Sequence, residues 1–190
     1  MDRIGNLDFE ISAKSFYQVN AKQTERMYEL VMDLAQLSGQ ETVYELYSGT
    51  GTISLFLAQK AKHVYGVESS EEAVKNAVEN AERNHLTNVS FICGTAEEEF
   101  VTLYEQGHRA HVVVVDPPRA GCDAKVIDTI LAMSPERIVY VSCKPSTLAR
   151  DLKRLCESGV YTVKHVQPVD VFGHTAHVEC VIGLRRKESL

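Results

Sequence analysis

The sequence lacks any pair of cysteines spaced like the ligands of a zinc site or the halves of a redox motif. Without a C-x-x-C pair, neither a zinc knuckle nor a disulfide framework is indicated. No apolar run approaches the roughly 18 residues of a membrane span, and no signal-peptide pattern opens the chain. We therefore expect a cytoplasmic protein with no membrane partner and with reduced thiols at Cys93, Cys122, Cys143, Cys156 and Cys180.

Positive charge is also scarce, because 20 Lys and Arg residues stand against 26 Asp and Glu residues, for a formal net charge of -6. A free-standing domain that holds nucleic acid by charge alone is normally basic. Any polyanion would therefore need another domain or a local patch. The basic residues near the motifs described below are Arg119, Lys144, Arg150, Lys153 and Arg154.

No internal repeat, low-complexity segment or linker interrupts the chain, so residues 1–190 are expected to form a single domain. Strand-like and helix-like patterns alternate along it, which predicts an α/β fold with a doubly wound, mostly parallel sheet. The strand-like segments of this alternation are 42–47, 63–67, 89–93, 111–115 and 138–142. The helix-like segments are 21–37, 51–60, 71–84, 96–105, 123–133 and 146–156.

The two ends of the chain depart from this alternation. Residues 7–11 predict a short strand before the main fold, and 160–169 and 176–184 are extended segments without a helix between them. Such a closing pair predicts an antiparallel edge. The expected helix caps are Asn20, Asp123 and a capping box formed by Ser69 and Glu72.

Cys143 follows the apolar run 138–142 and precedes a charge and a proline. It is therefore expected at the carboxyl end of a strand, the edge where open α/β sheets bind ligands. Pro145 is typical of a helix start, and the positive helix end together with Lys144 would favour the thiolate. The alternative is a small core residue. Local sequence leaves nucleophile and core residue evenly balanced.

A glycine turn between a strand and a helix indicates a cofactor site. Gly49 and Gly51 allow close approach of the backbone, and Glu68 at the end of the next strand is placed to bind ribose hydroxyls. Ser54 stands where the dinucleotide fingerprint has its third glycine, which disfavours a pyrophosphate. A cationic cofactor such as S-adenosylmethionine better suits the nearby acids, which are Glu45, Glu68 and Asp116.

Two further groups follow from their positions. Asp116, Pro117 and Pro118 form a rigid turn directly after four valines, at the same expected edge. Glu179 lies within an apolar strand, where a carboxylate is costly unless it faces a cleft, so it is a candidate general base with a raised pKa. His174 and His177 would point to opposite faces of an extended segment, and no metal site is expected.

Six motifs occur in a fixed order over nearly the whole chain, and together they resemble the S-adenosylmethionine-dependent RNA uracil-5 methyltransferases, the bacterial enzymes that make 5-methyluridine in ribosomal or transfer RNA. The motifs are Phe16-x-Gln18-Val19-Asn20, Glu45-Leu46-Tyr47-Ser48-Gly49-x-Gly51, Gly66-Val67-Glu68, Asp116-Pro117-Pro118-Arg119-Ala120-Gly121, Tyr140-Val141-Ser142-Cys143-Lys144-Pro145-x-Thr147-Leu148-Ala149-Arg150-Asp151 and His174-Thr175-x-His177-Val178-Glu179.

The resemblance implies a class I methyltransferase fold, Rossmann-like, with a seven-stranded sheet and an antiparallel C-terminal strand. It makes Cys143 the nucleophile and Glu179 the general base. The residues implied for S-adenosylmethionine are Gln18, Tyr47, Gly49, Gly51, Thr52, Glu68, Thr95 and Asp116, and those for the RNA base are Phe16, Asp116 and Arg119.

The implied partner is RNA, with 23S ribosomal RNA favoured over transfer RNA. Family members usually have an N-terminal RNA-binding module, to which nothing here corresponds, so we expect a domain that binds the cofactor but holds RNA poorly. Two alternatives stay open. One is a methyltransferase for an exocyclic amine, which would rely on the Asp-Pro-Pro turn and need no cysteine. The other is a cofactor-binding module without RNA turnover.

Overall fold

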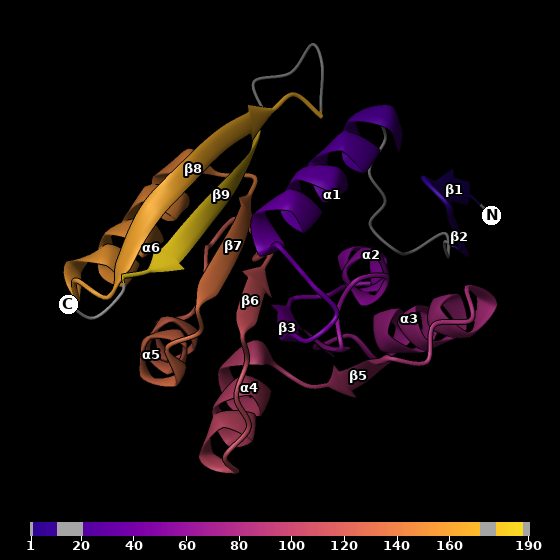
Figure 1. The fold of residues 1–190 in the computed structure, drawn as a ribbon, viewed down its shortest axis with the longest axis horizontal. Helices are drawn as coiled ribbons and strands as arrows, with labels where there is room; N and C mark the ends of the chain where they lie inside the picture. Colours follow the sequence, from indigo (N-terminus) through magenta and orange to yellow (C-terminus); the bar gives the residue numbers. More distant parts are fainter. Residues whose placement is uncertain (1, 11–20, 172–177, 188–190) are drawn as a thin grey trace.

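The computed structural model describes residues 2–10, 21–171 and 178–187, and a seven-stranded sheet lies at its centre (Figure 1). The strand order is β5-β4-β3-β6-β7-β9-β8. Neighbours among the first five are parallel, whereas β9 is antiparallel to both β7 and β8. The strands are β3 (Thr42–Leu46), β4 (His63–Glu68), β5 (Val89–Cys93), β6 (Val112–Val115), β7 (Arg137–Ser142), β8 (Tyr161–Val169) and β9 (Glu179–Arg186). The expected α/β sheet with an antiparallel closing pair is confirmed.

Helices cover both faces of this sheet, because side chains of a buried strand alternate between the faces. On one face Val112, Val114, Val139 and Val141 pack with α1 (Ala21–Ala35), α2 (Thr52–Ala58) and α3 (Glu71–Arg83). On the other, Val113 and its neighbours pack with α4 (Ala96–Glu105), α5 (Ala124–Met133) and α6 (Pro145–Glu157). Six helices therefore alternate with the strands as the sequence pattern predicts.

The helix caps agree with the sequence in two places and differ in one. Asp123 caps α5 by accepting a hydrogen bond from the Lys125 N–H at 2.8 Å, and Pro145 is in the first turn of α6. The cap of α3 is Ser70 rather than Ser69, because the Ser70 hydroxyl accepts from the Ala73 N–H. The expected cap Asn20 lies outside the described residues.

The first described residues form a β-hairpin, and the sequence predicts only one of its two strands. Strand β2 (Leu7–Phe9) lies within the expected segment, but it pairs with β1 (Asp2–Ile4), which was not expected. Gly5 in the turn has a φ of 58°, a conformation that glycine adopts without steric cost. Ile4, Leu7 and Phe9 are buried against α1 and α2. Within the described ranges no helix has both the length and the hydropathy to cross a membrane.

Candidate active site

The carboxyl edge of the parallel strands gathers the polar residues that the sequence analysis singled out. Parallel strands end at a common edge, so loops that follow them meet there. The glycine turn follows β3, and Glu68 ends β4. Asp116 follows β6 and Cys143 follows β7, while Glu179 begins the antiparallel strand β9 at the same edge.

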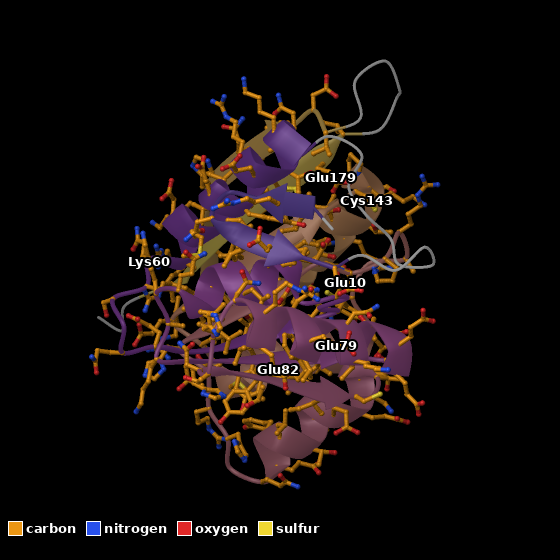
Figure 2. The ribbon with its side chains drawn as sticks, turned by 90° about the vertical axis from the view of Figure 1, so that its right-hand side faces the viewer. Glu10, Lys60, Glu79, Glu82, Cys143 and Glu179 are labelled. Atoms are coloured by element: carbon orange, nitrogen blue, oxygen red, sulfur yellow. The ribbon has the colours of Figure 1, made fainter. Side chains whose placement is uncertain are left out.

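Cys143 and Glu179 are brought close together by the register of two strands. Ser142 pairs with Cys180 in the antiparallel ladder between β7 and β9. The ladder ends at this pair, so Cys143, which follows Ser142, and Glu179, which precedes Cys180, both lie at its end, and the charge of Glu179 acts on the sulfur. Figure 2 shows the two side chains as neighbours at this edge.

Both side chains belong to the face of the sheet that α1 covers. Val141 and Val181 are in the core cluster of that face, and the alternation of a strand gives Cys143 and Glu179 the same orientation. Asp116 follows the same alternation after Val114 on the neighbouring strand β6. The sulfur and the two carboxylates therefore share one face at one edge.

Burial raises the pKa of Glu179, Asp116 and Cys143, and repulsion between charges adds to the rise for the latter two. Glu179 is only 5% exposed, and this burial raises its pKa. Desolvation, followed by the charge of Glu179, raises the pKa of Asp116 to about 7. Burial, and then the charges of Glu179 and Asp116, raise the pKa of Cys143. We expected Lys144 and the helix end to favour the thiolate, but the net shift of its pKa is upward, with burial as its largest cause; a backbone hydrogen bond and the charge of Arg119 oppose it.

The two glycines of the turn, Gly51 and Gly49, differ in whether a side chain would fit at their positions. Gly51 has a φ of 79°, and a Cβ there would lie 2.7 Å from Cζ of Phe91. Gly49 has a φ of 54°, but a Cβ there would have no atom of the described residues within 4 Å. Gly51 is thus required by the fold, whereas the open side of Gly49 leaves room for a ligand.

Glu68 holds the glycine turn in place. One of its carboxylate oxygens accepts a hydrogen bond from the Gly49 N–H at 3.0 Å, and the other accepts from the Ser70 N–H at 2.9 Å. The latter oxygen also accepts from the Ser69 hydroxyl at 3.2 Å, so of the carboxylate's roughly four acceptor sites the remaining one is on the oxygen bound to Gly49. The expected bond from ribose hydroxyls is compatible with this arrangement.

Glu45 lies beneath the turn rather than at its surface. It is 1% exposed and accepts a hydrogen bond from the buried Ser54 hydroxyl. Burial raises the pKa of Glu45 to about 8, with smaller contributions from Asp116 and Glu68, although the bond from Ser54 opposes the rise. Ser54, which stands in place of a third glycine, therefore has a structural partner.

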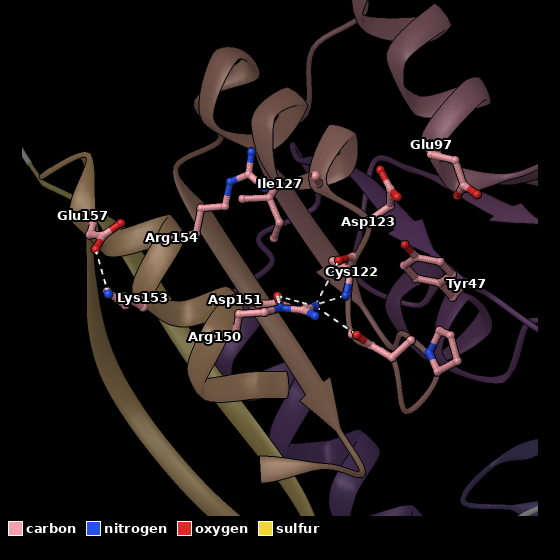
Figure 3. A pocket seen from close by; sticks show the side chains of 14 residues that line it. Tyr47, Glu97, Cys122, Asp123, Ile127, Arg150, Asp151, Lys153, Arg154 and Glu157 are labelled. Atoms are coloured by element: carbon pink, nitrogen blue, oxygen red, sulfur yellow. Dashed lines mark hydrogen bonds and ion pairs between the residues drawn. The ribbon is translucent and has the colours of Figure 1, made fainter. Parts of the chain in front are cut away.

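The remaining cofactor candidates differ in their surroundings. The Thr52 hydroxyl lies 3.1 Å from the hydroxyl of Tyr28 on α1, so it already has a partner. The Thr95 hydroxyl oxygen is buried without a hydrogen-bond partner at the start of α4. Tyr47, with a φ of 65°, lines a cavity of about 750 Å³ between α4, α5 and α6 (Figure 3).

Several expected residues cannot be placed. Phe16, Gln18, His174 and His177 lie outside the described residues. Within the described residues, no three His, Cys, Asp or Glu side chains form a group able to hold a metal ion. Arg119 is exposed, and its positive charge acts on the Cys143 sulfur, which places it beside the edge.

Sequence reasoning missed a buried amide behind the cofactor turn. Asn80 on α3 is 0% exposed, and its Oδ1 accepts from the Glu10 N–H at 2.7 Å. Its Nδ2 donates to the carbonyl oxygens of Glu10 and Thr50, both at 3.4 Å. Asn80 thus joins the end of β2 to the glycine turn. The available signal was an amide next to Ala77 and Ala81 on the buried face of a helix.

The arrangement fits a cofactor that has a ribose and a positive charge. Gly49 leaves open space, Glu68 offers an acceptor, and Thr95 has an unused hydroxyl. Desolvated carboxylates at Asp116 and Glu179 are stabilised by a neighbouring cation, which is the charge of a sulfonium.

The fold is that of the class I methyltransferases, as a solved relative shows. The crystal structure of Pyrococcus abyssi tRNA (uracil-54, C5)-methyltransferase in complex with S-adenosyl-L-homocysteine matches with a TM-score of 0.82 and 33% sequence identity, over 96% of this chain and 43% of that chain. The family model for tRNA (uracil-5-)-methyltransferase matches residues 4–187. This chain belongs to that family.

Curated relatives agree with this assignment. An uncharacterized RNA methyltransferase of Halalkalibacterium halodurans is 55% identical over 98% of this chain and 40% of its own length. One from Caldanaerobacter subterraneus is 55% identical over 97% of this chain and 41% of its own. The chain thus spans about 40% of the length of the curated relatives it matches.

Proposed function

We propose that this chain is a catalytic domain that transfers a methyl group from S-adenosylmethionine to carbon 5 of a uridine in RNA. The observation that supports this best is the cross-strand placement of Cys143 and Glu179 at the carboxyl edge. A methyltransferase for an exocyclic amine would need no thiol there. Family membership and a solved relative that binds S-adenosyl-L-homocysteine support the same reaction.

The chemistry needs a nucleophile and a base on the same ring. Carbon 5 of uracil is a weak nucleophile, and addition of the Cys143 sulfur to carbon 6 converts the ring to an enolate. When bound, S-adenosylmethionine supplies the electrophilic methyl group. Glu179 then accepts the proton from carbon 5, the bond to sulfur breaks, and the double bond between carbons 5 and 6 returns. A stacked uridine must be flipped out or presented in a loop.

The class of RNA is the finer part of the proposal. The family model and the Pyrococcus abyssi relative are named for transfer RNA, whereas the sequence analysis favoured 23S ribosomal RNA. The net charge of -6 indicates that the RNA is held by residues beyond the described edge or by a further domain. The proposed substrate is therefore a uridine in 23S ribosomal RNA or in transfer RNA.

A labelling experiment tests this proposal. The chain is incubated with S-adenosylmethionine carrying a tritiated methyl group and with unmodified transcripts of transfer RNA or 23S ribosomal RNA fragments, and the RNA is digested to nucleosides. Label in 5-methyluridine is expected. Label in an N-methylated nucleoside would support the exocyclic-amine alternative, and cofactor binding without any labelled RNA would support the binding module.

A further inference from the structure

Asp151, in the middle of α6, is a buried carboxylate that the reaction does not use directly. It is 3% exposed. One of its oxygens accepts hydrogen bonds from the Tyr140 hydroxyl at 2.7 Å and from the Cys122 N–H at 2.9 Å. The other accepts from Nε of Arg150 at 2.8 Å. Asp151 therefore ties together strand β7, helix α6 and the loop that contains Cys122.

Neighbouring side chains of α6 bind the same loop, residues 118–122. Arg150 Nη2 donates to the carbonyl oxygen of Ala120 at 2.9 Å and to that of Cys122 at 3.4 Å. The Thr147 hydroxyl lies 3.2 Å from the carbonyl oxygen of Arg119 and 3.1 Å from that of Lys144 at the start of its own helix, so its single proton is shared between the two. Figure 3 shows Arg150 and Asp151 next to the loop, with dashed lines for their hydrogen bonds to it. We call Thr147, Arg150 and Asp151 the loop clamp.

The loop fits against the clamp only because one residue has no side chain. Gly121 has a φ of 80°, and a Cβ there would lie 2.6 Å from both Arg150 Nη2 and Asp151 Oδ2. Its N–H donates to the Pro118 carbonyl at 2.8 Å, which closes the turn. The backbone at Gly121 thus rests directly on the two charged groups.

The clamp connects the two segments that contain the reacting groups. The 118–122 loop begins just after Asp116, and α6 begins just after Cys143. Asp116 and Cys143 are close enough for their charges to act on each other. Because the clamp fixes the loop to α6, it fixes the spacing between these two groups.

We infer that Asp151 is a positioning residue, which sets the placement of the Asp116 segment against the Cys143 sulfur for attack on the base. This inference rests on the proposed function. Misplacement of reacting groups by about 1 Å lowers rates by about a hundredfold. Glu68 ends β4 and the glycine turn follows β3, so the cofactor contacts expected there, unlike that of Asp116, do not depend on the clamp.

The test compares two variants with a matched control. Asp151→Asn keeps the shape but removes the charge that accepts from Arg150, and Gly121→Ala pushes the loop from the clamp without changing any charge. Glu157→Gln is the control, since Glu157 is on the same helix but pairs with Lys153 at 3.4 Å instead of the loop. For each protein, kcat and KM are measured in the labelling assay, together with S-adenosylmethionine affinity by calorimetry and hydrogen exchange of the 118–122 amides.

If the clamp positions the loop, kcat should fall about tenfold to a hundredfold in both variants, and the loop amides should exchange faster. KM and the cofactor affinity should change by less than about threefold. The control should behave as wild type. Unchanged exchange in the loop, or faster exchange with an unchanged kcat, would overturn the positioning role. A wild-type chain that transfers no methyl group would instead overturn the proposed function, and this inference with it.

Discussion

Cys143 and Glu179 lie close together at the end of the antiparallel ladder between β7 and β9, next to its last pair, Ser142 and Cys180. Their relationship has two consequences. It places a thiol and a carboxylate on the same face at the edge where the parallel strands end. It also raises the pKa of the thiol, because the charge of Glu179 adds to the effect of burial.

Cys143→Ala should abolish methyl transfer while leaving the cofactor bound. Removal of a covalent nucleophile lowers kcat to about a thousandth of the wild-type value or less. Calorimetry with S-adenosylmethionine should give an affinity close to that of the wild type. Cys156→Ala, on α6, is the matched control and should keep activity. Substantial transfer by the Cys143 variant would instead favour methylation of an exocyclic amine.

Glu179→Gln should stop the reaction after the methyl group has been transferred. Without a carboxylate to take the proton from carbon 5, the bond between sulfur and carbon 6 persists. Denaturing gels with labelled cofactor should therefore show methylated RNA attached to the protein. Free 5-methyluridine formed at the wild-type rate would exclude Glu179 as the base.

The pH at which Cys143 becomes reactive should depend on the charge of Glu179. Only the thiolate reacts with iodoacetamide, and the pKa of Cys143 is raised, so alkylation should reach half its maximal rate above the pH of about 8.5 that is usual for cysteine. Glu179→Gln removes a repelling charge and should lower that midpoint. A midpoint unchanged by the substitution would show that the two groups do not interact.

The charge of the cofactor should act on the same thiol. S-adenosylmethionine and S-adenosyl-L-homocysteine shield the site alike, but only the former has a positive sulfur. A cation within a few ångström favours the thiolate, so alkylation of Cys143 at neutral pH should be about tenfold faster with S-adenosylmethionine than with S-adenosyl-L-homocysteine. Equal rates at saturation would contradict a cation placed beside Cys143 and Asp116.

Substitutions at the two turn glycines should affect the stability of the fold and the binding of the cofactor differently. Gly51→Ala should lower the free energy of unfolding by about 2 kcal/mol or more, because it adds a clash with Phe91 to the cost of a positive φ. Gly49→Ala has only the φ cost, of about 1 kcal/mol, but its methyl group enters the open space expected for the cofactor. Denaturant unfolding and calorimetry measure both effects. Cofactor affinity unchanged in Gly49→Ala would move the cofactor away from this turn.

Acid should destabilise the fold partly through Glu41. Burial opposes ionisation, but hydrogen bonds from the N–H and hydroxyl of Ser38 and from the Gln40 N–H outweigh it and hold the pKa of Glu41 at about 2. A lowered pKa stabilises the fold above the ordinary carboxyl pKa of about 4.3, and this contribution disappears as the pH falls from there towards 2. Glu41→Gln should flatten the pH dependence of unfolding in that range. Glu79→Gln, which removes an exposed pair with Lys75, is the control and should leave it unchanged.

The sequence was sufficient for the fold where patterns are local. Alternating strands and helices predicted the sheet, and the isolated glutamate at position 179 marked the edge. What it could not supply depends on contacts between distant segments. The insertion of β9 between β7 and β8 follows from pairing alone. Lys144 is next to Cys143 in the chain, but besides burial the charges that act on the thiol are those of Glu179, Asp116 and Arg119, which are distant in the sequence.

The roles of buried polar residues are the other feature that the sequence did not predict. The sequence motif that contains Asp151 does not reveal its role, although Asp151 lies on the buried face of α6 beside Leu148 and Leu155. A charge at such a position signals a buried partner. The partners themselves, Tyr140 and the Cys122 backbone, become visible only when the loop is folded against the helix.

The most direct test of the account uses RNA in which 5-fluorouridine replaces uridine. Fluorine at carbon 5 cannot leave as a proton does, so an adduct between protein and base should persist after methyl transfer. The account predicts a complex that survives denaturation, forms only with S-adenosylmethionine, and yields on digestion a peptide with the nucleotide attached to Cys143. An adduct on another residue, or methylated RNA produced without any covalent complex, would contradict it.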